Sequence, residues 1–508
     1  MTPRCGALMI CGTTSDAGKS TLVAGLCRLL ARQGVAVAPF KGQNMSLNSM
    51  VTAEGAEIGR AQWLQARAAL VPAEAAMNPV LLKPTSEHSS QVVLMGRPLG
   101  VQEAAPYQRS KDRLIDVVDG ALASLRDRFD VVICEGAGSP AEINLLDNDI
   151  VNLGLARRAG IPAVVVGDIH RGGVFAHLYG TVAILPEDLR ACVKGFIINM
   201  FRGDQALLGD ATEQLEQRCG VPTLGVVPYL PELVLDAEDS LHHLLRTLEG
   251  AASFDGEGID VAVIRFPRLS NFTDLDPLLI EPGVRVRFVG HPSALGQPDL
   301  VVLPGTKSTV ADLEWMRAGG LADALEALRR RPRPPAILGI CGGFQILGRR
   351  ICDPGGVEST QPEVDGLGWL DLTVTFATDK VTRLRQARDE VGNPVEGYEI
   401  HHGLAAPGPS WQRWLDPVGG EFGDDVASGR APGLPIFGTA VHGAFEADGF
   451  RHAFLALVAQ EAGKIWRPSG RSFEAARQSQ IDRVADACAD ALDFDTLWRI
   501  IESSAIPA

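Results

Sequence analysis

Short apolar runs of strand length recur along the chain and alternate with longer stretches of helical periodicity. In the first half these runs have the uninterrupted apolar character of strands buried in a parallel sheet. They span residues 7–11, 35–40, 131–136, 163–168, 195–200 and 224–229. Helical patterns lie between them, as at 20–33 and 111–128. The alternation predicts a doubly wound α/β domain.

A second series of the same kind follows an interruption. Residues 231–258 are acidic and mixed, which indicates a connector with room for one helix. The strand-like runs beyond it span residues 260–266, 284–289, 299–305, 336–341, 364–376, 395–401 and 436–442. The remaining pattern predicts helices over 309–331, 448–463 and 474–503 and a long Gly- and Pro-rich loop over 404–435. We therefore predict two doubly wound α/β domains, at residues 1–245 and 255–508.

The composition is compatible with this division. The chain has 508 residues, of which 46% are hydrophobic and 21% charged. At roughly 150 residues per domain the length would allow about three domains, so two series of strands imply two domains larger than average. The 55 glycines and 32 prolines are typical of many tight loops, and they are too few for a disordered or collagen-like chain.

Charge and cysteine content exclude several classes of function. The formal net charge is −15 at pH 7, so the basic surface that binds nucleic acid or anionic membranes is not expected. The sequence has no uninterrupted run of 18 or more apolar residues, so no membrane span is predicted. The nine cysteines lack the paired spacing of a zinc site and form no evident disulfide framework, which favours the reducing cytoplasm.

A glycine-rich segment after the first predicted strand has the pattern of a phosphate-binding loop. The sequence GTTSDAGKST opens a predicted helix, where backbone N–H groups and the helix dipole favour phosphate. Five residues separate its glycines instead of the usual four, and the alternative is a strand–helix turn without a ligand. Lys19 would meet the β- and γ-phosphates of ATP, and the Ser20 hydroxyl would bind Mg²⁺. The expected ATP-binding residues are Gly12, Thr13, Asp16, Ala17, Gly18, Lys19, Ser20 and Thr21.

Charged side chains follow three other predicted strands of this half. Glu135 precedes Gly-Ala-Gly at the end of the third strand, where a carboxylate would help to hold the metal. Asp168 ends the next strand in the same way. Lys41 follows the second strand and is placed to face the same crevice. The alternative for each is a solvated side chain on a loop.

In the second half, the sequence AILGICGGFQ predicts a strand, a sharp turn and a helix, with Cys341 at the turn. This geometry exposes a nucleophile and favours its thiolate, whereas a buried inert thiol is expected for the other eight cysteines. His442, at the end of another strand, is the preferred base, with His401 and His402 as rivals. The residues expected to form or support an oxyanion hole are Gly305, Gly342 and Gly343.

Nine motifs distributed along the chain resemble those of a known family. In the first half they are GTTSDAGKS, PFKGQNMSLNS, ICEGAGSPAEINL, VGDIHRGGVFA and INMFRGD. In the second half they are LPGTKSTVADLEWM, GICGGFQILG, GYEIHHG and GTAVHGAFE. In this order, and over nearly the whole chain, they resemble the glutamine-dependent cobyric acid synthase family of cobalamin biosynthesis. The first domain is similar to dethiobiotin synthetase, and the second to triad-type class I glutamine amidotransferases.

The resemblance implies a reaction. ATP and Mg²⁺ would serve to phosphorylate the b, d, e and g carboxylates of a corrinoid, adenosylcobyrinic acid a,c-diamide, and ammonia released from L-glutamine would convert them to amides. Cys341 would form a glutamyl thioester, with His442 moving its protons. Glu57 would align with a metal-binding aspartate of dethiobiotin synthetase, and Asn199 matches a position that reads adenine. The residues proposed to contact the corrinoid are Gln43, Asn44, Asn48 and Asp168.

The chain departs from the family pattern in three places. Triad amidotransferases carry His-x-Glu, whereas here Gly443 and Ala444 follow His442. Glu446, four positions on, need not substitute, so we predict a Cys–His dyad. His170 and Met200 also replace the aspartate and lysine that are usual in their motifs.

Two other interpretations compete with this one. A cobyrinic acid a,c-diamide synthase would share both domains, but it has a different, aspartate-bearing sequence after its lysine where this chain has GQNMSLNS. A phosphate-loop switch protein with a vestigial amidotransferase domain is a different class. The intact Lys19, Cys341 and His442 argue against that class.

Overall fold

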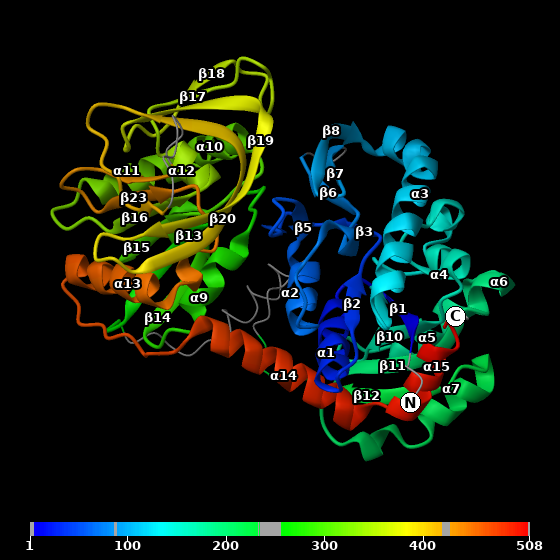
Figure 1. The fold of residues 1–508 in the computed structure, drawn as a ribbon. Helices are drawn as coiled ribbons and strands as arrows, with labels where there is room; N and C mark the ends of the chain where they lie inside the picture. The colour runs from blue at the N-terminus through cyan, green and yellow to red at the C-terminus, as the bar shows by residue number, and fades with distance from the viewer. Residues whose placement is uncertain (1–4, 86–88, 232, 234–255, 419–426, 506–508) are drawn as a thin grey trace. The chain divides into compact units, whose positions relative to one another are not determined.

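The computed structural model describes residues 5–85, 89–231, 233, 256–418 and 427–505. The chain forms two compact units, each built from several stretches of sequence. The first comprises Met1–Ser46, Thr52–Asp239 and Arg477–Ala508, and the second comprises Leu47–Val51 and Ser240–Ala476. Each unit contains a six-stranded, largely parallel sheet flanked by helices, which confirms the predicted α/β fold class (Figure 1).

The sheet of the first unit contains all six strands predicted from the first series of apolar runs. Its order is β12 (Thr223–Pro228), β11 (Val193–Phe201), β10 (Ala163–Asp168), β1 (Gly6–Gly12), β9 (Val131–Glu135) and β2 (Val37–Phe40), and all neighbours are parallel. β1 lies between β10 and β9: the chain runs from β1 to β2 and β9 on one side of it, and then crosses to β10, β11 and β12 on the other. The carboxyl end of β1 is therefore at the switch point where open α/β sheets bind ligands.

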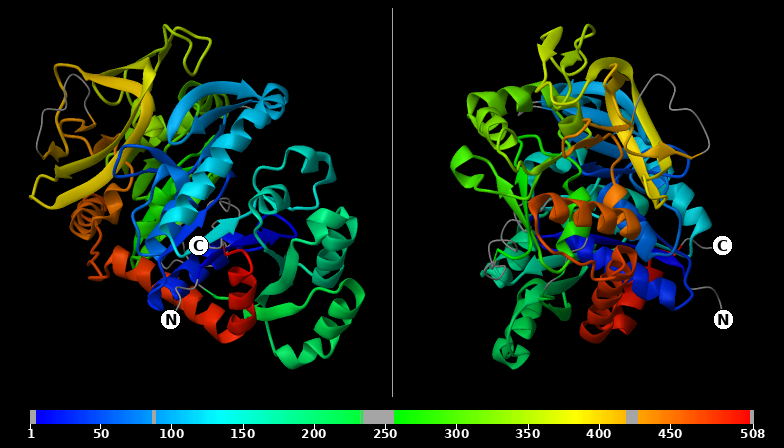
Figure 2. Two further views of the ribbon diagram at one scale, coloured as in Figure 1. Left: turned by 45° about the vertical axis from the view of Figure 1, so that its right-hand side comes forward. Right: turned by 90° about the vertical axis from the view of Figure 1, so that its left-hand side faces the viewer.

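The last two helices of the chain belong to the first unit. α14 (Phe473–Ala491, from Arg477 onward) and α15 (Phe494–Glu502) pack with α1 (Lys19–Arg32) on the sheet, and they are the red helices in Figures 1 and 2. Their buried side chains share one core with Leu22 and Leu26 of α1. The predicted boundary of 255–508 is therefore wrong for the C-terminal segment, because an amphipathic pattern does not specify which sheet the helix covers.

A small sheet in the first unit was missed by the sequence analysis. Its strands are β3 (Gln43–Met45), β6 (Val80–Pro84), β7 (Ser89–Leu94) and β8 (Arg97–Glu103). Short strands that bury Asn44, Lys83 and Gln91 lack the apolar pattern on which the prediction rested. The other helices of this unit are α2 (Arg60–Ala68), α3 (Ala104–Arg128), α4 (Leu153–Ala159), α5 (Val174–Ile184), α6 (Glu187–Arg190) and α7 (Ala211–Cys219).

The second unit has its own six-stranded sheet. The order is β14 (Val284–Val289), β13 (Ile259–Ile264), β15 (Leu300–Leu303), β16 (Ala336–Ile340), β23 (Ile436–Thr439) and β22 (Ser428–Arg430). Only the pairing of β22 with β23 is antiparallel among these described strands. The helix predicted over 309–331 is divided into α10 (Thr309–Ala318) and α11 (Leu321–Arg329) by Gly319 and Gly320, the latter at a φ of 75°.

A five-stranded sheet completes this unit. Its strands are β18 (Glu363–Asp365), β17 (Arg350–Cys352), β19 (Leu372–Arg388), β20 (Pro394–Pro407) and β21 (Asp416–Pro417), and its main feature is the long antiparallel hairpin of β19 and β20. The loop predicted over 404–435 is thus interrupted by the end of β20, by β21 and by β22. Residues 419–426 and most of the predicted connector, 231–258, lie outside the described residues.

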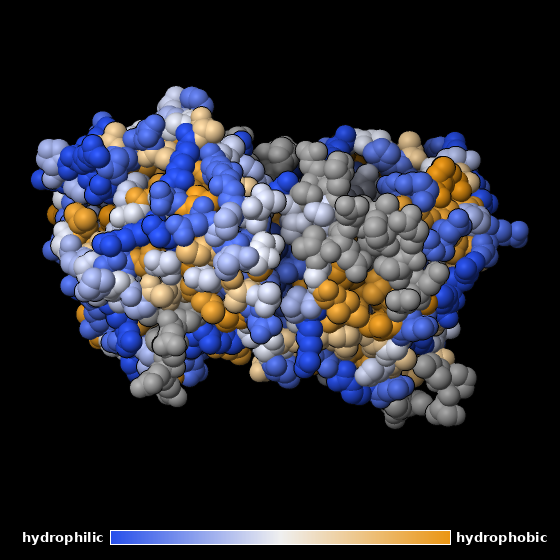
Figure 3. Space-filling model, turned by 90° about the horizontal axis from the view of Figure 1, so that it is seen from above, coloured by the Kyte–Doolittle hydropathy of each residue, from blue (hydrophilic) through white to orange (hydrophobic). Residues whose placement is uncertain are grey.

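The sequence predicts no membrane span, and the length and apolarity of the helices can be compared with this prediction. Within the described ranges, no helix is both long and apolar enough to cross a bilayer. The face drawn in Figure 3 is mostly hydrophilic, with hydrophobic residues in separate groups.

The remaining helices of the second unit are α9 (Asp276–Leu279), α12 (Gly342–Ile346) and α13 (Asp448–Ala462).

The packing of α14 on α1 leads to a test. A Cβ atom at Gly25 would lie 2.6 Å from Val484 Cγ1 and 3.0 Å from Cys488 Sγ. We expect Gly25→Leu to overpack this contact and to destabilise the first unit by about 1–3 kcal/mol, measured as a lower urea midpoint. Gly120→Ala is the matched control, because Gly120 is exposed in α3 and a Cβ there would have nothing within 4 Å. An unchanged midpoint for Gly25→Leu would show that the contact is not tight.

Candidate functional site

The loop between β1 and α1 turns tightly around Asp16 and Gly18, whose φ angles are 58° and 87°. A Cβ at Gly18 would lie only 2.2 Å from Asn199 Nδ2. That amide nitrogen donates a hydrogen bond to Ala17 O at 3.0 Å. Asn199, near the end of β11, therefore braces the phosphate-binding loop.

Lys19 is buried and lies across the same loop. Its Nζ donates to Thr14 O at 3.0 Å and to Gly138 O at 3.2 Å. Gly12 leaves room for it, since a Cβ there would lie 3.0 Å from Lys19 Nζ. The Thr13 N–H bonds to Val166 O of β10 at 2.9 Å, and Thr21 follows in the first turn of α1. The loop thus presents an ammonium group, a glycine-rich turn and a helix start at one strand end.

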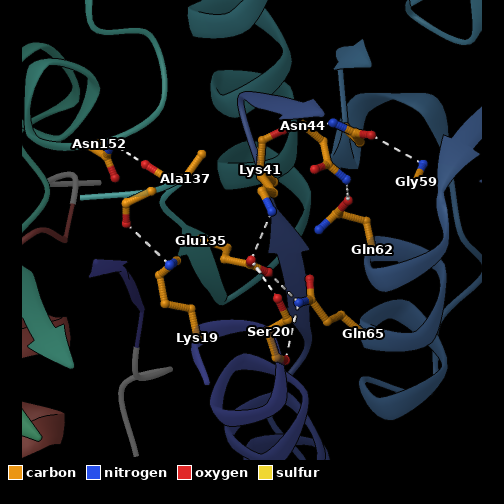
Figure 4. Close-up of polar contacts among 12 residues, drawn as sticks. Lys19, Ser20, Lys41, Asn44, Gly59, Gln62, Gln65, Glu135, Ala137 and Asn152 are labelled. Carbon is orange, nitrogen blue, oxygen red and sulfur yellow. Dashed lines mark hydrogen bonds and ion pairs between the residues drawn. The ribbon is translucent and has the colours of Figure 1, made fainter. Parts of the chain in front are cut away.

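Glu135, at the end of β9, is the centre of a polar cluster (Figure 4). Ser20 Oγ donates to Glu135 Oε1 at 2.7 Å, Lys41 Nζ to the same oxygen at 2.9 Å, and Gln65 Nε2 to Oε2 at 2.6 Å. Burial alone would raise the pKa of this carboxyl, but Lys41, Gln65 and Ser20 hold the pKa below its ordinary value. The carboxylate is therefore kept anionic.

The predicted metal ligands only partly come together. Ser20 and Glu135 offer a hydroxyl and a carboxylate oxygen, which fit Mg²⁺ in a site whose other ligands are phosphate and water. In the described part of the chain no three His, Cys, Asp or Glu side chains cluster as a metal site of their own. Glu57 is buried in an ion pair with Lys83 Nζ at 2.7 Å, and its metal role stays a prediction.

The residues proposed to contact the corrinoid lie in different surroundings. Gln43 and Asn44 are in β3, where Asn44 Nδ2 donates to Gln62 Oε1 at 2.8 Å. Asp168 Oδ1 accepts from His170 N at 2.7 Å. Asn48 is buried in the second unit, and its Oδ1 accepts from Phe272 N at 3.1 Å, so this oxygen is already occupied by the protein backbone.

In the second unit, Cys341 stands at the predicted turn between β16 and α12. Its backbone has φ 49° and ψ −107°, a conformation that a residue other than glycine adopts only when the surroundings enforce it. The Cys341 N–H donates to Thr439 O at 2.7 Å, which ties the turn to β23. This is the strained strand-to-helix turn that presents a nucleophile at the edge of a sheet.

His442 faces Cys341 and is itself held by an aspartate. The ring donates from Nδ1 to Asp274 Oδ2 at 2.7 Å, and Gly443 N donates to Asp274 Oδ1 at 2.8 Å. The ring also stacks on Tyr398, with ring centroids 5.3 Å apart. The predicted Cys–His dyad is therefore wrong in its lack of a carboxylate: Asp274 completes the arrangement, and Glu446 does not supply it.

The pKa values of Cys341 and His442 depend on each other and on Asp274. Burial alone would raise the pKa of the Cys341 thiol, but the charge of His442 and a hydrogen bond with it lower that pKa below its ordinary value. Burial alone would lower the pKa of His442, but Asp274 and Cys341 raise it to about 10. At neutral pH a thiolate–imidazolium pair is therefore favoured over two neutral groups.

The rival histidines have other partners. His401 lies 3.9 Å from Glu399, measured from Nε2 to Oε1, and Glu399 also pairs with Arg385 at 2.7 Å. Burial would raise the pKa of Glu399, but His401 and the arginines hold it at about 2. His402 Nδ1 contacts Ala377 O at 3.1 Å. His401 adds to the positive charge near Cys341, whereas His442 makes the direct contact.

The three glycines of the predicted oxyanion hole allow the loop after β15 to lie close to the Cys341 turn and to His442. A Cβ at Gly305 would lie 3.1 Å from His442 Cε1, and one at Gly342 would lie 2.6 Å from Thr306 Cγ2. The Gly343 N–H donates to Pro304 O at 3.1 Å, so Gly343 supports the turn and is not available as an oxyanion donor. Gly342 begins α12, and its N–H therefore has no intrahelical acceptor.

Three residues of these sites were missed by the sequence analysis: Gln65, Lys83 and Asp274. Each is polar and buried, and each reaches its partner across at least 26 positions of sequence. Asp274 stands 168 positions before His442. The segment SNFTDLD, which contains it, carries two carboxylates and begins four residues after the strand predicted over 260–266, and that was the available signal.

Comparison with known proteins places both units in described families. Residues 8–242 match the CobQ/CobB/MinD/ParA nucleotide binding domain, and residues 260–450 match the CobB/CobQ-like glutamine amidotransferase domain. A protein of Streptomyces avermitilis named cobyric acid synthase is 52% identical, over 98% of this chain and 97% of its own length. Proteins of the same name from Mycobacterium sp. (strain KMS) and Nocardia farcinica are 49% and 50% identical, over 99% and 98% of this chain and 98% and 97% of their own lengths.

The thiolate–imidazolium pair predicts a pH-dependent reactivity. In wild type, alkylation of Cys341 by iodoacetamide should extend to lower pH than that of an ordinary thiol, because His442 lowers the pKa of the Cys341 thiol. In His442→Gln the pKa should rise, and the labelling rate at about pH 6 should fall roughly tenfold. Mass spectrometry of the Cys341 peptide measures the rate, with the Cys352 peptide as an internal control. Equal rates in both proteins would contradict the pairing.

Proposed function

The chain belongs to the cobyric acid synthase family of ATP-dependent glutamine amidotransferase ligases, and from this premise we propose how its two sites share the reaction. The substrate is proposed to be adenosylcobyrinic acid a,c-diamide, amidated at its b, d, e and g carboxylates. The main support for this proposal is that one chain contains both a polar cluster around Glu135 beside the phosphate-binding loop and a Cys341–His442–Asp274 arrangement.

In the second unit the proposed step releases ammonia from L-glutamine. The Cys341 thiolate attacks the side-chain carbonyl carbon, and the His442 imidazolium gives its proton to the departing nitrogen, which leaves as ammonia. A glutamyl thioester remains. Water, losing a proton to the now neutral His442, then attacks the thioester, so that glutamate leaves and the thiolate–imidazolium pair is restored. Asp274 is a positioning residue that keeps Nε2 of His442 directed at the sulfur.

Backbone groups beside Cys341 are proposed to stabilise the oxyanion that forms on the glutamine carbonyl. The Gly342 N–H is our preferred donor, because it begins α12 beside the nucleophile. The loop that contains Gly305 lies close enough to the His442 ring to contribute a second donor. Gly343 has the supporting role described above.

In the first unit the proposed step activates a carboxylate. A carboxylate oxygen of the corrinoid attacks the γ-phosphorus of ATP, the bond to the β-phosphate bridging oxygen breaks, and ADP leaves. Ammonia then attacks the acyl carbon of the acyl phosphate, inorganic phosphate leaves, and the nitrogen loses a proton to form the amide. Lys19 and the loop N–H groups are proposed to hold the phosphates. Lys41 is proposed to neutralise developing charge near Glu135.

Ser20 and Glu135 are proposed to hold Mg²⁺, which when bound would neutralise phosphate charge. Lys41 and Gln65 orient Glu135 for this role by fixing both of its oxygens. Gln43 and Asn44, on β3 of the same unit, stay our proposed corrinoid contacts. We also propose a cytoplasmic location, which fits nine cysteines that are all described and all free.

Amide counting tests the function as a whole. The wild-type enzyme with MgATP and glutamine should add four amides to adenosylcobyrinic acid a,c-diamide, counted by mass. Cys341→Ala should lose at least about 10³-fold of glutamine-dependent turnover, since nucleophilic catalysis is removed. With saturating ammonia as nitrogen source it should retain the activity of wild type. Lys19→Ala should lose turnover with either source.

The controls distinguish the alternatives. Cys352→Ala, in which a half-buried thiol with a raised pKa is removed, should behave as wild type. Addition of two amides to cobyrinic acid and none to the diamide would identify an a,c-diamide synthase instead. Glutamine hydrolysis that persists in Cys341→Ala would refute the nucleophile.

The contact of Asp274 with His442 predicts a change in pH dependence. With Asp274 present, the pKa of His442 is about 10, so the imidazolium form exists throughout the neutral range and is lost only as the pH rises through that value. Asp274→Asn removes the charge that raises this pKa, so the basic limb of glutaminase kcat/KM should move to lower pH. We expect activity at about pH 8 to fall roughly 10²-fold. A limb at the wild-type position would show that Asp274 does not control His442.

A further inference from the structure

The sequence GQNMSLNSMV crosses from one unit to the other within a few residues. Lys41, which binds Glu135, and the strand β3 belong to the first unit, whereas Leu47–Val51 belong to the second. The second part contains Asn48 and the short strand β4 (Ser49–Val51), and it is buried throughout from Asn48 to Val51. A polar, asparagine-containing segment that is this deeply buried requires an explanation.

Asn48 and Asn271 bind each other's backbone segments. Asn48 Oδ1 accepts from Phe272 N at 3.1 Å, and Asn271 Oδ1 accepts from Ser49 N at 2.9 Å. Both side chains are buried, at 2% and 4% exposure. Asn271 has a φ of 49°, a left-handed conformation that asparagine tolerates better than most residues. We refer to this reciprocal arrangement of Asn48 and Asn271 as the asparagine pair.

The asparagine pair lies at the base of the short turn that carries Asp274. The Asp274 N–H donates to Asn271 O at 3.1 Å, so the residue that binds Ser49 also fixes the start of the turn. Asp274 in turn holds both His442 and Gly443. β4 also lies against β19 and β20, and β20 contains Tyr398, whose N–H and carbonyl bond to the backbone of His442. Segment 48–51 therefore touches two of the supports of the same histidine.

We propose that Asn48 and Asn271 are positioning residues of the glutaminase, which hold Asp274 at the distance that keeps His442 directed at Cys341. This assigns the second part of the GQNMSLNS motif to ammonia release, although the motif begins beside the phosphate loop. It also replaces the sequence-based expectation that Asn48 contacts the corrinoid. The proposal rests on the proposed roles of Cys341 and His442 in glutamine hydrolysis.

Variants of the pair test the proposal in the full-length enzyme. Asn48→Ala removes the acceptor for Phe272 N, and Asn271→Gly removes the acceptor for Ser49 N while tolerating the left-handed backbone. Each should lower glutaminase kcat roughly 10- to 100-fold, since small misplacements at a catalytic group have effects of this order. Each should also move the basic limb of the glutaminase profile to lower pH, in the direction expected for Asp274→Asn. Amidation with saturating ammonia should stay within about twofold of wild type.

Asn48→Ser retains a neutral oxygen near the accepting position and should recover part of the activity lost in Asn48→Ala. Unchanged glutamine hydrolysis in both Asn48→Ala and Asn271→Gly would overturn the proposal, and so would a lower rate without a shift of the basic limb. Loss of ammonia-dependent amidation in Asn48→Ala would overturn it in favour of a corrinoid contact. The Cys341→Ala control separates the two levels: if that variant still hydrolyses glutamine, the proposed function itself has failed.

Discussion

Both sites depend on the same physical constraint, the cost of burying a charge without a partner. Moving an isolated ion from water into a protein interior costs several kcal/mol, so each buried charge must be paired. Glu135 is paired with Lys41, and His442 is paired with Asp274. Because the partners come from other strands and turns, the need to pair these charges fixes where those segments must run. Polar contacts at the strand ends, more than the apolar sheets beneath them, therefore determine the detailed geometry of each site.

Charge pairing has opposite results in the two sites. Around Glu135, the donors Lys41, Gln65 and Ser20 keep a carboxylate anionic, which suits a ligand for a divalent cation. Around Cys341, a carboxylate behind the histidine keeps the imidazole cationic, which in turn favours a thiolate. One arrangement suits the binding of a cation, whereas the other suits the formation of a nucleophile within the protein.

Local patterns were sufficient to predict the parallel strands, the phosphate loop, the Cys341 turn and the strand end at His442. Each of these is a strand followed directly by a short loop, so the pattern and the geometry coincide in a few residues. Asp274, Gln65 and Lys83 could not be assigned in this way, because their partners are distant in sequence. The contact of Asn48 could not be predicted for the same reason, since nothing in its neighbours indicates a backbone partner at Phe272. The family relationship supports the overall reaction, while the individual residue roles stay proposals.

The placement of α14 and α15 has a consequence for synthesis of the protein. The last strand of the large sheet of the first unit ends at Pro228, but the helical residues that complete the core of this unit begin at Arg477, within α14. At about 5–20 residues per second, translation of the intervening chain takes on the order of 10–50 s. During that interval the face of α1 that contains Gly25 lacks its native cover, which includes Val484 and Cys488 of α14. The nascent chain thus exposes apolar surface while the second unit is still being made, and a chaperone that binds such surface has a defined window in which to act.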